Sequence, residues 1–483
     1  MTGERPRLTR ATQLPQEVGL PVQPTSNGIV HIGVGAFHRA HQAVFTQDAM
    51  RASGDRRWGI LGTTQRSPLV AQCLEPQGGA FTVLTVDSET SSAEVVGSVT
   101  RVLVPDSDTV RIIECIQSPS TQVITITVTE KGYTMGPGGG LDLRPLANDL
   151  ATLAAEEREG SLDPQPTSSM LGLLMRGLAA RRRARAGPIT VLSCDNMVGN
   201  GAVLERLVRA GVASIKNGEA LQAWLDQHVT FPSSVVDRIV PATTHEVLDS
   251  VERMIGARDE GAVVAEPYRS WIIEDRFAAE RPPWELAGVQ FVSDVAPFEE
   301  AKLRMLNGTH SILAFAGLLR GHRTIDSALA DPMVRASAEA YLFGDALPSV
   351  HSVPGVDLND YAQTILRRFA NTALGHSTTQ VGSDASLKIP QRWIPVALDR
   401  LNEGVVPLGV AEAVATWAAA VIRHPQALQD PMRNDIAAAV TRAHGEQEAL
   451  LALLSLPTIF PFAVGSNEAF RNACANMLPR LLR

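Results

Sequence analysis

The sequence has little cysteine, and its four cysteines are widely scattered. Cys73, Cys115, Cys194 and Cys474 form no CxxC pair and no Cys/His cluster. This spacing argues against a disulfide framework and against a zinc site, so we expect no bound metal. We therefore interpret the four cysteines as buried thiols of a protein in a reducing compartment.

Long hydrophobic runs are also lacking. The longest apolar stretches, such as VATWAAAVI from Val414, have about half of the ~20 residues that a membrane-spanning helix needs. The first residues, MTGERPRLTRATQLPQEVGLP, contain charges and prolines but no apolar segment typical of a secretory signal. We therefore expect a cytoplasmic protein without a membrane partner.

Basic residues are fewer than acidic ones. Lys and Arg number 43 against 51 Asp and Glu, which gives a net charge of −8. This balance argues against nucleic acid or anionic membranes as partners. The hydrophobic fraction of 45% indicates a folded protein. A chain of 483 residues is too long for one ordinary core, so we expect two domains.

The first part of the chain alternates β-rich runs with helical patterns, which predicts an α/β domain with a largely parallel sheet. The β-rich runs are residues 29–32, 58–64, 81–87, 121–130 and 188–196, and the clearest helical patterns are 109–117 and 169–184. The basic run RRRAR, residues 181–185, closes the second pattern. We interpret that run as a solvated helix end, where cations suit the helix dipole.

The second part of the chain is predicted to be helical, with its own core. Helical patterns occupy residues 296–321, 324–344, 360–375, 408–424 and 447–457. The boundary falls between Glu280 and Pro297. We divide the chain into an α/β domain, 1–292, and a helical domain, 293–483.

The stretch GVGAFH, Gly33 to His38, follows the first β-rich run and precedes an amphipathic helical pattern. It resembles a dinucleotide fingerprint, although His38 stands at the third glycine. A plain strand–helix turn is the alternative. No acid follows the second β-rich run, where Arg66 stands instead, and this leaves room for NADP beside NAD.

Asp195 and Asn196 directly follow the β-rich run that ends in VLSC. Ligands of open α/β sheets bind at this edge, and an asparagine there can donate its amide to an oxyanion. The competing interpretation is an Asx-type turn or a helix cap.

Lys302, Asn307 and His310 lie within an apolar helical pattern, where polar groups need partners or do chemistry. On an ideal helix Lys302 and Asn307 are about 140° apart, too wide for one stripe unless Gly308 distorts the turn. The competing interpretation is a snorkelling lysine and a satisfied core histidine.

Taken together, these stretches resemble the long-chain mannitol dehydrogenase family, which includes polyol dehydrogenases and fructuronate reductase. The resemblance rests on GIVHIGVGAFHRAHQA, TVTEKGY, VLSCDN, FPSSVVDRIVPAT, WIIEDRF and KLRMLNGTHS, which occur in the family's order. It runs from about Gly28 to Arg392. It implies a Rossmann-type dinucleotide-binding domain, 1–292, and a mostly α-helical substrate and catalytic domain, 293–483. It also implies a substrate cleft between them and metal-free hydride transfer.

The resemblance also implies roles for particular residues. Lys302 would be the acid/base, Asn196 and Asn307 the oxyanion donors, and His310 would orient the substrate or Lys302. The cofactor would lie against Gly33, Gly35, Phe37 and His38, with Arg66 nearby, and the substrate would contact Asp237, Lys388 and Gln380. A free lysine has a pKa near 10.4, so a base at neutral pH requires burial and nearby positive charge.

The substrate segment departs from both branches of the family. Gly375 and Ser377 replace two arginines of the sugar-acid reductases, and Gln380 replaces an arginine of the mannitol dehydrogenases. Because carboxylates favour bidentate arginine, we expect a neutral polyol/ketose pair of mannitol/fructose type. Fructuronate reductase is the alternative, since Lys388, Arg392 or Arg66 could receive an anion.

The cofactor expected from the family is NAD, with NADP as the rival, because Pro68 or Leu69 stands where mannitol dehydrogenases carry the acid that selects NAD. The remaining expectations are a small-molecule substrate and a monomer or small homo-oligomer. A non-catalytic nucleotide-binding protein on the same fold is a further alternative.

Overall fold

The computed structural model describes residues 5–65, 67–128, 130–424 and 429–483. The chain forms two compact units, one ending at Val295 and the other beginning at Ala296. Each unit has its own secondary structure and its own buried core.

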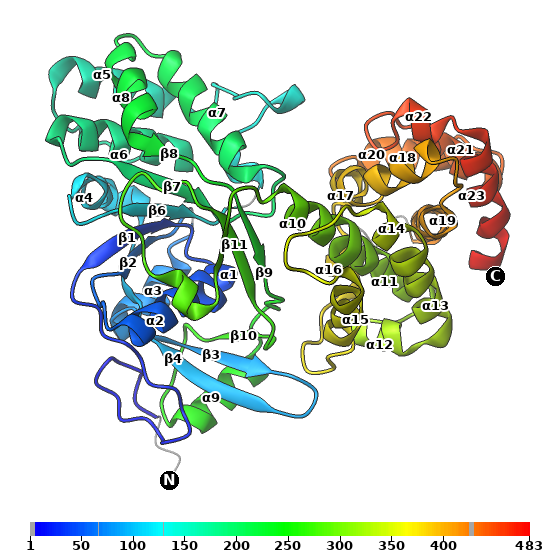
Figure 1. Ribbon diagram of the computed structural model, residues 1–483, viewed down its shortest axis with the longest axis horizontal. Helices are drawn as coiled ribbons and strands as arrows, with labels where there is room; N and C mark the ends of the chain where they lie inside the picture. The colour runs from blue at the N-terminus through cyan, green and yellow to red at the C-terminus, as the bar shows by residue number, and fades with distance from the viewer. Residues whose placement is uncertain (1–4, 66, 129, 425–428) are drawn as a thin grey trace. The chain divides into compact units, whose positions relative to one another are not determined.

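The first unit is built on a six-stranded sheet in the order β5-β2-β1-β6-β7-β8, in which all neighbouring strands are parallel (Figure 1). This is the strand order of a Rossmann-type sheet, and the predicted fold class is confirmed. The strands are β1 (Asn27–Ile32), β2 (Gly59–Thr63), β5 (Val99–Leu103), β6 (Val123–Ile126), β7 (Ile189–Ser193) and β8 (Val229–Thr230).

Alternating residues of these strands enter two hydrophobic cores, one on each face of the sheet. Val30 and Ile124 pack in one core, whereas their neighbours Ile29 and Val123 pack in the other. The first core is completed by α4 (Pro105–Gln117), α6 (Met170–Ala184), α7 (Asn200–Ala213) and α8 (Glu219–His228). The second is completed by α2 (Gln42–Ser53) and by strands outside the parallel sheet. The central strands are therefore buried on both faces.

Two smaller sheets extend this unit, and one of them corrects a prediction. The run 81–87 does form strand β3 (Phe81–Val86), but β3 pairs antiparallel with β4 (Ser91–Val96) and parallel with β10 (Val263–Ala265), outside the six-stranded sheet. The other small sheet has the order β12-β11-β9. Its strands are β9 (Ser234–Asp237), β11 (Ser270–Glu274) and β12 (Gln290–Val292).

The remaining helices of the first unit are short or peripheral. They are α1 (Ala36–Ala40), α3 (Leu69–Leu74), α5 (Ala147–Glu159) and α9 (His245–Ile255), with 3₁₀ turns at Glu75–Gln77, Glu130–Tyr133, Pro137–Gly139 and Trp284–Ala287. The helical pattern after the glycine turn is divided between α1 and α2, because His41 between them leaves the helical region with φ −121° and ψ −89°.

The second unit is helical, as predicted, and α19 (Leu408–Arg423) is buried at its centre. Helices α11 (Gly308–Leu319), α13 (Pro332–Tyr341), α21 (Glu446–Leu454) and α23 (Glu468–Leu481) pack on α19 (Figure 1). The others are α10 (Ala296–Ala301), α12 (Ile325–Ala330), α14 (Leu347–Ser349), α15 (Leu358–Phe369), α16 (Thr378–Gly382), α17 (Ala385–Arg392), α18 (Ile394–Asn402), α20 (Arg433–Thr441) and α22 (Phe462–Gly465), with π-helical turns at Lys302–Asn307 and Leu342–Ala346.

The basic run at the end of α6 is not fully solvated, contrary to the prediction. Arg181 is 1% exposed and donates to backbone carbonyls, among them those of Ile116 and Ser118 at 2.9 Å. Arg182 and Arg183 bind Glu157 at 2.7 and 2.8 Å. Backbone carbonyls of neighbouring segments therefore offset the cost of burying the Arg181 guanidinium. An argument from the helix dipole alone does not predict this burial.

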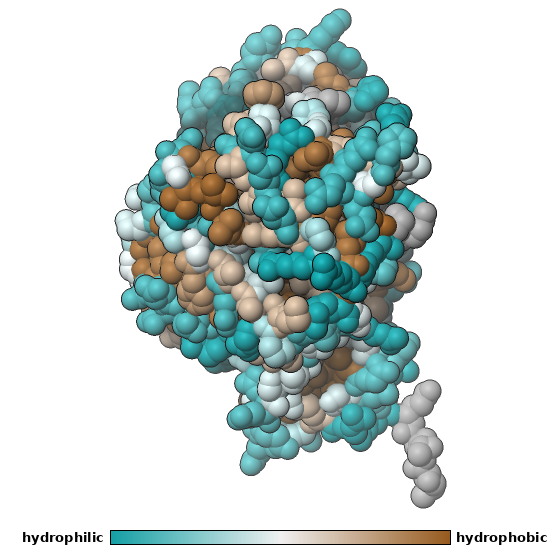
Figure 2. Space-filling view, turned by 90° about the vertical axis from the view of Figure 1, so that its right-hand side faces the viewer, coloured by the Kyte–Doolittle hydropathy of each residue, from teal (hydrophilic) through white to brown (hydrophobic). Residues whose placement is uncertain are grey.

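Two of the four thiols are less buried than predicted. Cys194 and Cys474 are buried, whereas Cys73 and Cys115 are half-buried, and all four are free thiols. On the face shown in Figure 2, hydrophobic side chains form small groups separated by hydrophilic ones. Within the described residues, no helix has the length and apolar character needed to cross a membrane.

Candidate functional site

The glycine turn after β1 has the shape that close backbone approach requires. Gly33 has φ +102°, and a Cβ there would lie 2.1 Å from the carbonyl oxygen of Thr127. A Cβ on Gly35 would meet nothing nearer than 3.9 Å. The turn is thus closed on its sheet side at Gly33 and open at Gly35, where a bound pyrophosphate could approach the backbone.

His38, which stands at the third glycine of the fingerprint, is fully buried below the turn. Its ring stacks on that of His31 with centroids 3.5 Å apart. Burial, followed by the nearby His31 and Arg39, lowers the pKa of His38 well below its usual value. The half-buried Phe37 stacks on His41 at 4.9 Å. His38 is therefore an uncharged packing group, and any cofactor contact by Phe37 or His38 stays a prediction.

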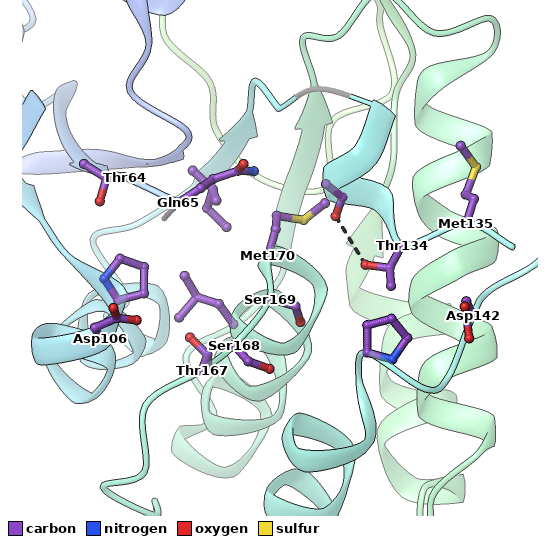
Figure 3. A pocket seen from close by; sticks show the side chains of 15 residues that line it. Thr64, Gln65, Asp106, Thr134, Met135, Asp142, Thr167, Ser168, Ser169 and Met170 are labelled. Carbon is purple, nitrogen blue, oxygen red and sulfur yellow. Dashed lines mark hydrogen bonds between the residues drawn. The ribbon is translucent and has the colours of Figure 1, made fainter. Parts of the chain in front are cut away.

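A cavity of about 480 Å³ opens beside the carboxyl ends of β1, β2 and β5 (Figure 3). Its lining includes Thr64 and Gln65 after β2 and Asp106 at the start of α4. Gly132, Thr134 and Met135 also line it, as do residues 167–170, which lead into α6. The Thr64 Oγ1 and Gln65 Nε2 atoms are buried and have no hydrogen-bond partner within the described part of the chain. Because buried polar atoms normally find partners, these two atoms suit a polar ligand. Arg66 lies outside the described residues.

The turn after β7 carries Asp195 and Asn196. The Asp195 carboxylate accepts a hydrogen bond of 2.6 Å from the Val128 N–H and another from the Tyr133 hydroxyl. Ser193 Oγ donates to it at 3.3 Å. Burial raises the pKa of Asp195 to about 7, although these donors oppose the shift. Asp195 therefore ties this turn to the segment after β6, rather than capping α7, which begins only at Asn200.

Asn196, the predicted oxyanion donor of the first unit, is exposed on this turn. The backbone around it is fixed by a second polar contact. Asn200 Nδ2 donates at 2.8 Å to the carbonyl oxygens of both Asp195 and Ser234. The turn that presents Asn196 is thus held from two sides.

Asp237 ends strand β9 and is 8% exposed. The next residue, Arg238, is equally buried and donates at 3.0 Å to the carbonyl oxygen of Glu266. Burial lowers the pKa of Arg238 to about 10. Within the family-like segment around Asp237, Arg238 therefore holds neighbouring loops together.

In the second unit, Lys302 and Asn307 are the first and last residues of a π-helical turn. The Gly308 N–H reaches the carbonyl oxygen of Leu303, five residues earlier. A π turn brings residues five apart closer to one side of the helix than an α turn does. The distortion required for Lys302 and Asn307 to share a side is present, and it precedes Gly308.

His310 follows the π turn and lies against two rings. It stacks on Phe369 at 4.6 Å and meets His376 edge-on at 5.0 Å. The His310 Nε2 and His376 Nδ1 atoms are buried and have no hydrogen-bond partner among residues that the structure describes. Burial, followed by His376, Arg392 and Lys388, lowers the pKa of His310 well below its usual value. His310 is therefore a neutral imidazole with one unused nitrogen.

Cationic side chains lie near this imidazole pair. Lys388 donates to the carbonyl oxygens of Val381 and Ser383 at 3.0 and 2.6 Å. Arg392 donates to the Asn307 carbonyl at 3.1 Å and to Ser311 Oγ at 2.7 Å. Lys388 and Arg392 thus bring positive charge to the end of the π turn.

Gly375, Ser377 and Gln380, the three positions expected to depart from family arginines, lie in and just before helix α16. Gly375 is exposed with φ +55°, a conformation that an arginine would rarely adopt. Ser377 is the N-cap of α16, and its side chain accepts from the Gln380 N–H. Gln380 itself is exposed. This segment therefore has a turn and a cap at positions 375 and 377.

Sequence reasoning missed several residues of these sites: Thr64, Gln65, Tyr133, Tyr341 and His376. Their contacts come from elements far apart in the chain, and the only sequence signal was the position of Tyr133 in TEKGY. The described residues contain no group of three His, Cys, Asp or Glu side chains that could hold a metal ion.

Known proteins resemble the whole chain. Residues 27–286 match the mannitol dehydrogenase Rossmann domain, and residues 294–482 match the mannitol dehydrogenase C-terminal domain. D-mannonate oxidoreductase of Escherichia coli is 37% identical over 92% of this chain and 91% of its own. Mannitol 2-dehydrogenase of Cereibacter sphaeroides is 35% identical over 81% and 80%. The structure of Pseudomonas fluorescens mannitol 2-dehydrogenase, a ternary complex with NAD and D-mannitol, is 32% identical, covers 98% of this chain and 96% of its own, and has a TM-score of 0.85.

Proposed function

This chain belongs to the mannitol dehydrogenase family, and on that premise we propose that it is an NAD(P)-dependent oxidoreductase that interconverts a polyol and a ketose of mannitol/fructose type. The observation that carries the proposal is the π turn, which has Lys302 at its start, Asn307 at its end and the neutral His310 just after it. A lysine, an amide and an imidazole are the groups needed to move a proton and to stabilise an alkoxide.

In the proposed mechanism, Lys302 Nζ takes the hydroxyl proton of a secondary alcohol as the carbon–oxygen bond becomes a carbonyl. The amides of Asn307 and Asn196 donate to the oxygen while it carries negative charge. His310 donates or accepts through Nε2 to orient the substrate, and Asp237, Lys388 and Gln380 bind its other hydroxyls. When bound, a nicotinamide cofactor would supply the acceptor for the hydride that leaves the same carbon.

The dinucleotide would be held by the glycine turn and by the cavity at the ends of β1, β2 and β5. The fit rests on the open face at Gly35 and on the unused polar atoms of Thr64 and Gln65. Gly33, Gly35 and Phe37 are the proposed contacts from the turn, with His38 beneath it and Arg66 beyond Gln65.

A second candidate, reduction of a sugar acid such as fructuronate, is favoured by the cations around His310. Burial is the main cause that lowers the pKa of His310, but Arg392, Lys388 and Arg368 lower it further, so positive charge reaches this part of the second unit. A substrate carboxylate would compensate that charge. The exposed turn at Gly375 and the cap at Ser377 favour the neutral polyol instead.

A substrate panel separates the two candidates. Oxidation of NADH and of NADPH is followed with fructose, xylulose, fructuronate and tagaturonate. The proposal predicts the highest kcat/KM with a neutral ketose, and a strong preference for the uronates would establish the second candidate. Nucleotide binding without turnover on any sugar would instead indicate a non-catalytic protein.

We also propose a cytoplasmic location and a monomer or small homo-oligomer that binds no nucleic acid. The net charge of −8 and the free thiols support this assignment. Fractionation of the source cells and light scattering of the purified protein test it.

A further inference from the structure

The exposed turn that presents Asn196 is flanked by two buried polar residues. Asp195 precedes Asn196 and is 6% exposed, and Asn200, four positions after Asn196, is fully buried. An oxyanion donor lowers a barrier only when it is held in advance where the negative charge develops. The placement of an exposed donor therefore depends on the backbone that its buried neighbours fix.

The Asp195 side chain fixes the start of the turn against the segment after β6. Its carboxylate accepts hydrogen bonds from the Val128 N–H at 2.6 Å and from the hydroxyl of Tyr133, which is itself fully buried. Ser193 Oγ lies 2.8 Å from the Tyr133 hydroxyl oxygen and donates to the same carboxylate at 3.3 Å. A buried acceptor with three donors has little freedom to move, because each lost contact would leave a polar atom unpaired.

The Asn200 side chain fixes the other side of the turn, against strand β9. Its Nδ2 donates at 2.8 Å to the carbonyl oxygens of both Asp195 and Ser234, and its Oδ1 accepts from the Ser234 N–H at 3.0 Å. Ser234 is the first residue of β9, and this strand ends at Asp237, the proposed substrate contact. One buried amide therefore relates the turn of Asn196 to the strand of Asp237.

This use of Asn200 differs from the usual role of an asparagine at the start of a helix. Asparagine commonly caps the helix locally, but the N-cap of α7 is Gly199, and the Asn200 amide reaches residues 5 and 34 positions away. The start of α7 is also close-packed, because a Cβ on Gly201 would lie 2.6 Å from the carbonyl oxygen of Phe231. The contact with β9 thus belongs to tertiary packing rather than to helix initiation.

We propose that Asp195 and Asn200 are positioning residues, which hold the Asn196 amide in place for oxyanion binding and set its place relative to Asp237. The inference rests on the proposed function, in which Asn196 donates to the alkoxide. Asp195 and Asn200 contact no substrate in this assignment. They act through the backbone of residues 195–200.

The kinetics of Asp195→Asn and Asn200→Ala test the positioning role. Asp195→Asn keeps the size of the side chain but replaces one acceptor oxygen by a donor, and Asn200→Ala removes the amide that joins the turn to β9. Each should lower kcat on the best sugar of the panel by about 10- to 100-fold, because a displacement of about 1 Å near a reacting centre costs up to this much. NADH affinity should stay within about twofold of the wild type, since the glycine turn after β1 is unchanged.

A double-mutant cycle with Asn196→Ala separates positioning from a general loss of stability. Once the Asn196 amide is absent, no donor remains to be positioned, so adding Asp195→Asn or Asn200→Ala should lower kcat by less than about twofold. A merely structural role would give the same fold loss in kcat with and without the Asn196 amide.

Asp259→Asn is the matched control, because Asp259 is another buried carboxylate of the first unit. It is 3% exposed and accepts from the N–H groups of Thr82 at 2.6 Å and Gly261 at 2.8 Å and from Gln77 Nε2 at 2.8 Å. Asp259→Asn should lower the unfolding temperature but leave kcat unchanged. Thermal unfolding also checks that each variant is folded, and should Asn200→Ala have lost its fold, the Asp195→Asn result decides.

Hydrogen exchange gives a readout that needs no turnover. The backbone amides of residues 194–199 should exchange faster in Asp195→Asn and Asn200→Ala than in the wild type, because the turn loses contacts that keep it closed. Exchange of the same residues in Asp259→Asn should match the wild type.

Two results would overturn the inference and leave the proposed function standing. One is an equal fold loss of kcat with and without the Asn196 amide, and the other is unaltered kcat and exchange in folded Asp195→Asn and Asn200→Ala. Absence of turnover by the wild type on every sugar would refute the proposed function. The exchange of residues 194–199 would then decide alone whether Asp195 and Asn200 hold the turn.

Discussion

The hydroxyl of Tyr341 donates a hydrogen bond of 2.7 Å to the carbonyl oxygen of Arg304, inside the π turn that begins at Lys302 and ends at Asn307. A π turn leaves carbonyl groups without their usual α-helical partners, and Tyr341 supplies a donor for one of them. Gly308 permits this approach, because a Cβ there would lie 2.1 Å from the Tyr341 hydroxyl oxygen.

Tyr341→Phe should therefore destabilise the π turn and disturb the placement of Lys302 against Asn307. We expect a loss of about 1–3 kcal/mol in the free energy of unfolding, since a buried carbonyl loses its donor. We also expect a lower kcat with unchanged NADH affinity. Urea unfolding, steady-state kinetics and NADH binding measure the three effects. Unaltered kcat in a destabilised variant would show that the hydrogen bond serves folding only.

The two glycines of the turn after β1 should respond differently to alanine. Gly33→Ala places a Cβ 2.1 Å from a carbonyl oxygen at φ +102°, so it should cost at least about 1–3 kcal/mol of stability. Gly35→Ala meets no protein atom nearer than 3.9 Å, so stability should stay within about 1 kcal/mol while nucleotide affinity falls. Thermal unfolding and NADH titration of both variants check this contrast. Equal nucleotide affinity in Gly35→Ala and the wild type would count against the turn as a pyrophosphate site.

Asp195 should contribute a pH dependence to stability that Asp195→Asn removes. The folded-state pKa of about 7 lies above the unfolded value near 3.9. The folded protein thus binds the proton more tightly, and this contribution to stability is full near pH 4 and is lost as the pH rises to about 7. The difference in unfolding free energy between wild type and Asp195→Asn should fall over that range. Urea unfolding from pH 4.5 to 8 measures it, and a constant difference would contradict the raised pKa.

His310 should remain uncharged at every pH at which the enzyme is assayed. Burial and the neighbouring His376, Arg392 and Lys388 all lower its pKa. In NMR spectra with labelled histidine, the His310 signal, assigned by its loss in His310→Gln, should not titrate between pH 8 and 5.5. A midpoint near 6.5 would mean that the imidazole is solvated and that another group must orient the substrate.

The fold could be predicted well where the pattern is local. Alternation of β-rich runs and helical patterns indicated a largely parallel sheet, because each strand and helix has its own periodicity, and the family resemblance indicated its Rossmann type. The run Phe81–Val86 was correctly predicted as a strand, but its place in an antiparallel pair depends on β4, which offered no strong signal. Pairing is a long-range property that the residues of one strand do not fix.

The candidate site was predictable only in part, for a related physical reason. Lys302, Asn307 and His310 stood out because polar residues in an apolar pattern are costly without a role. The π turn that relates them depends on Tyr341, 37 positions after Arg304, and the environment of His310 depends on Phe369 and His376. Likewise, the buried state of Arg181 is set by carbonyls of other segments. Such partners are visible only in the folded chain.

The most direct test of the account is the turnover number of Lys302→Ala, measured beside its NADH dissociation constant on the best sugar of the panel. We predict a loss of about 10²- to 10⁴-fold in kcat, the usual contribution of a general acid/base, with NADH affinity within about twofold of the wild type. A variant that keeps nearly full kcat at neutral pH would show that Lys302 does not carry the proton.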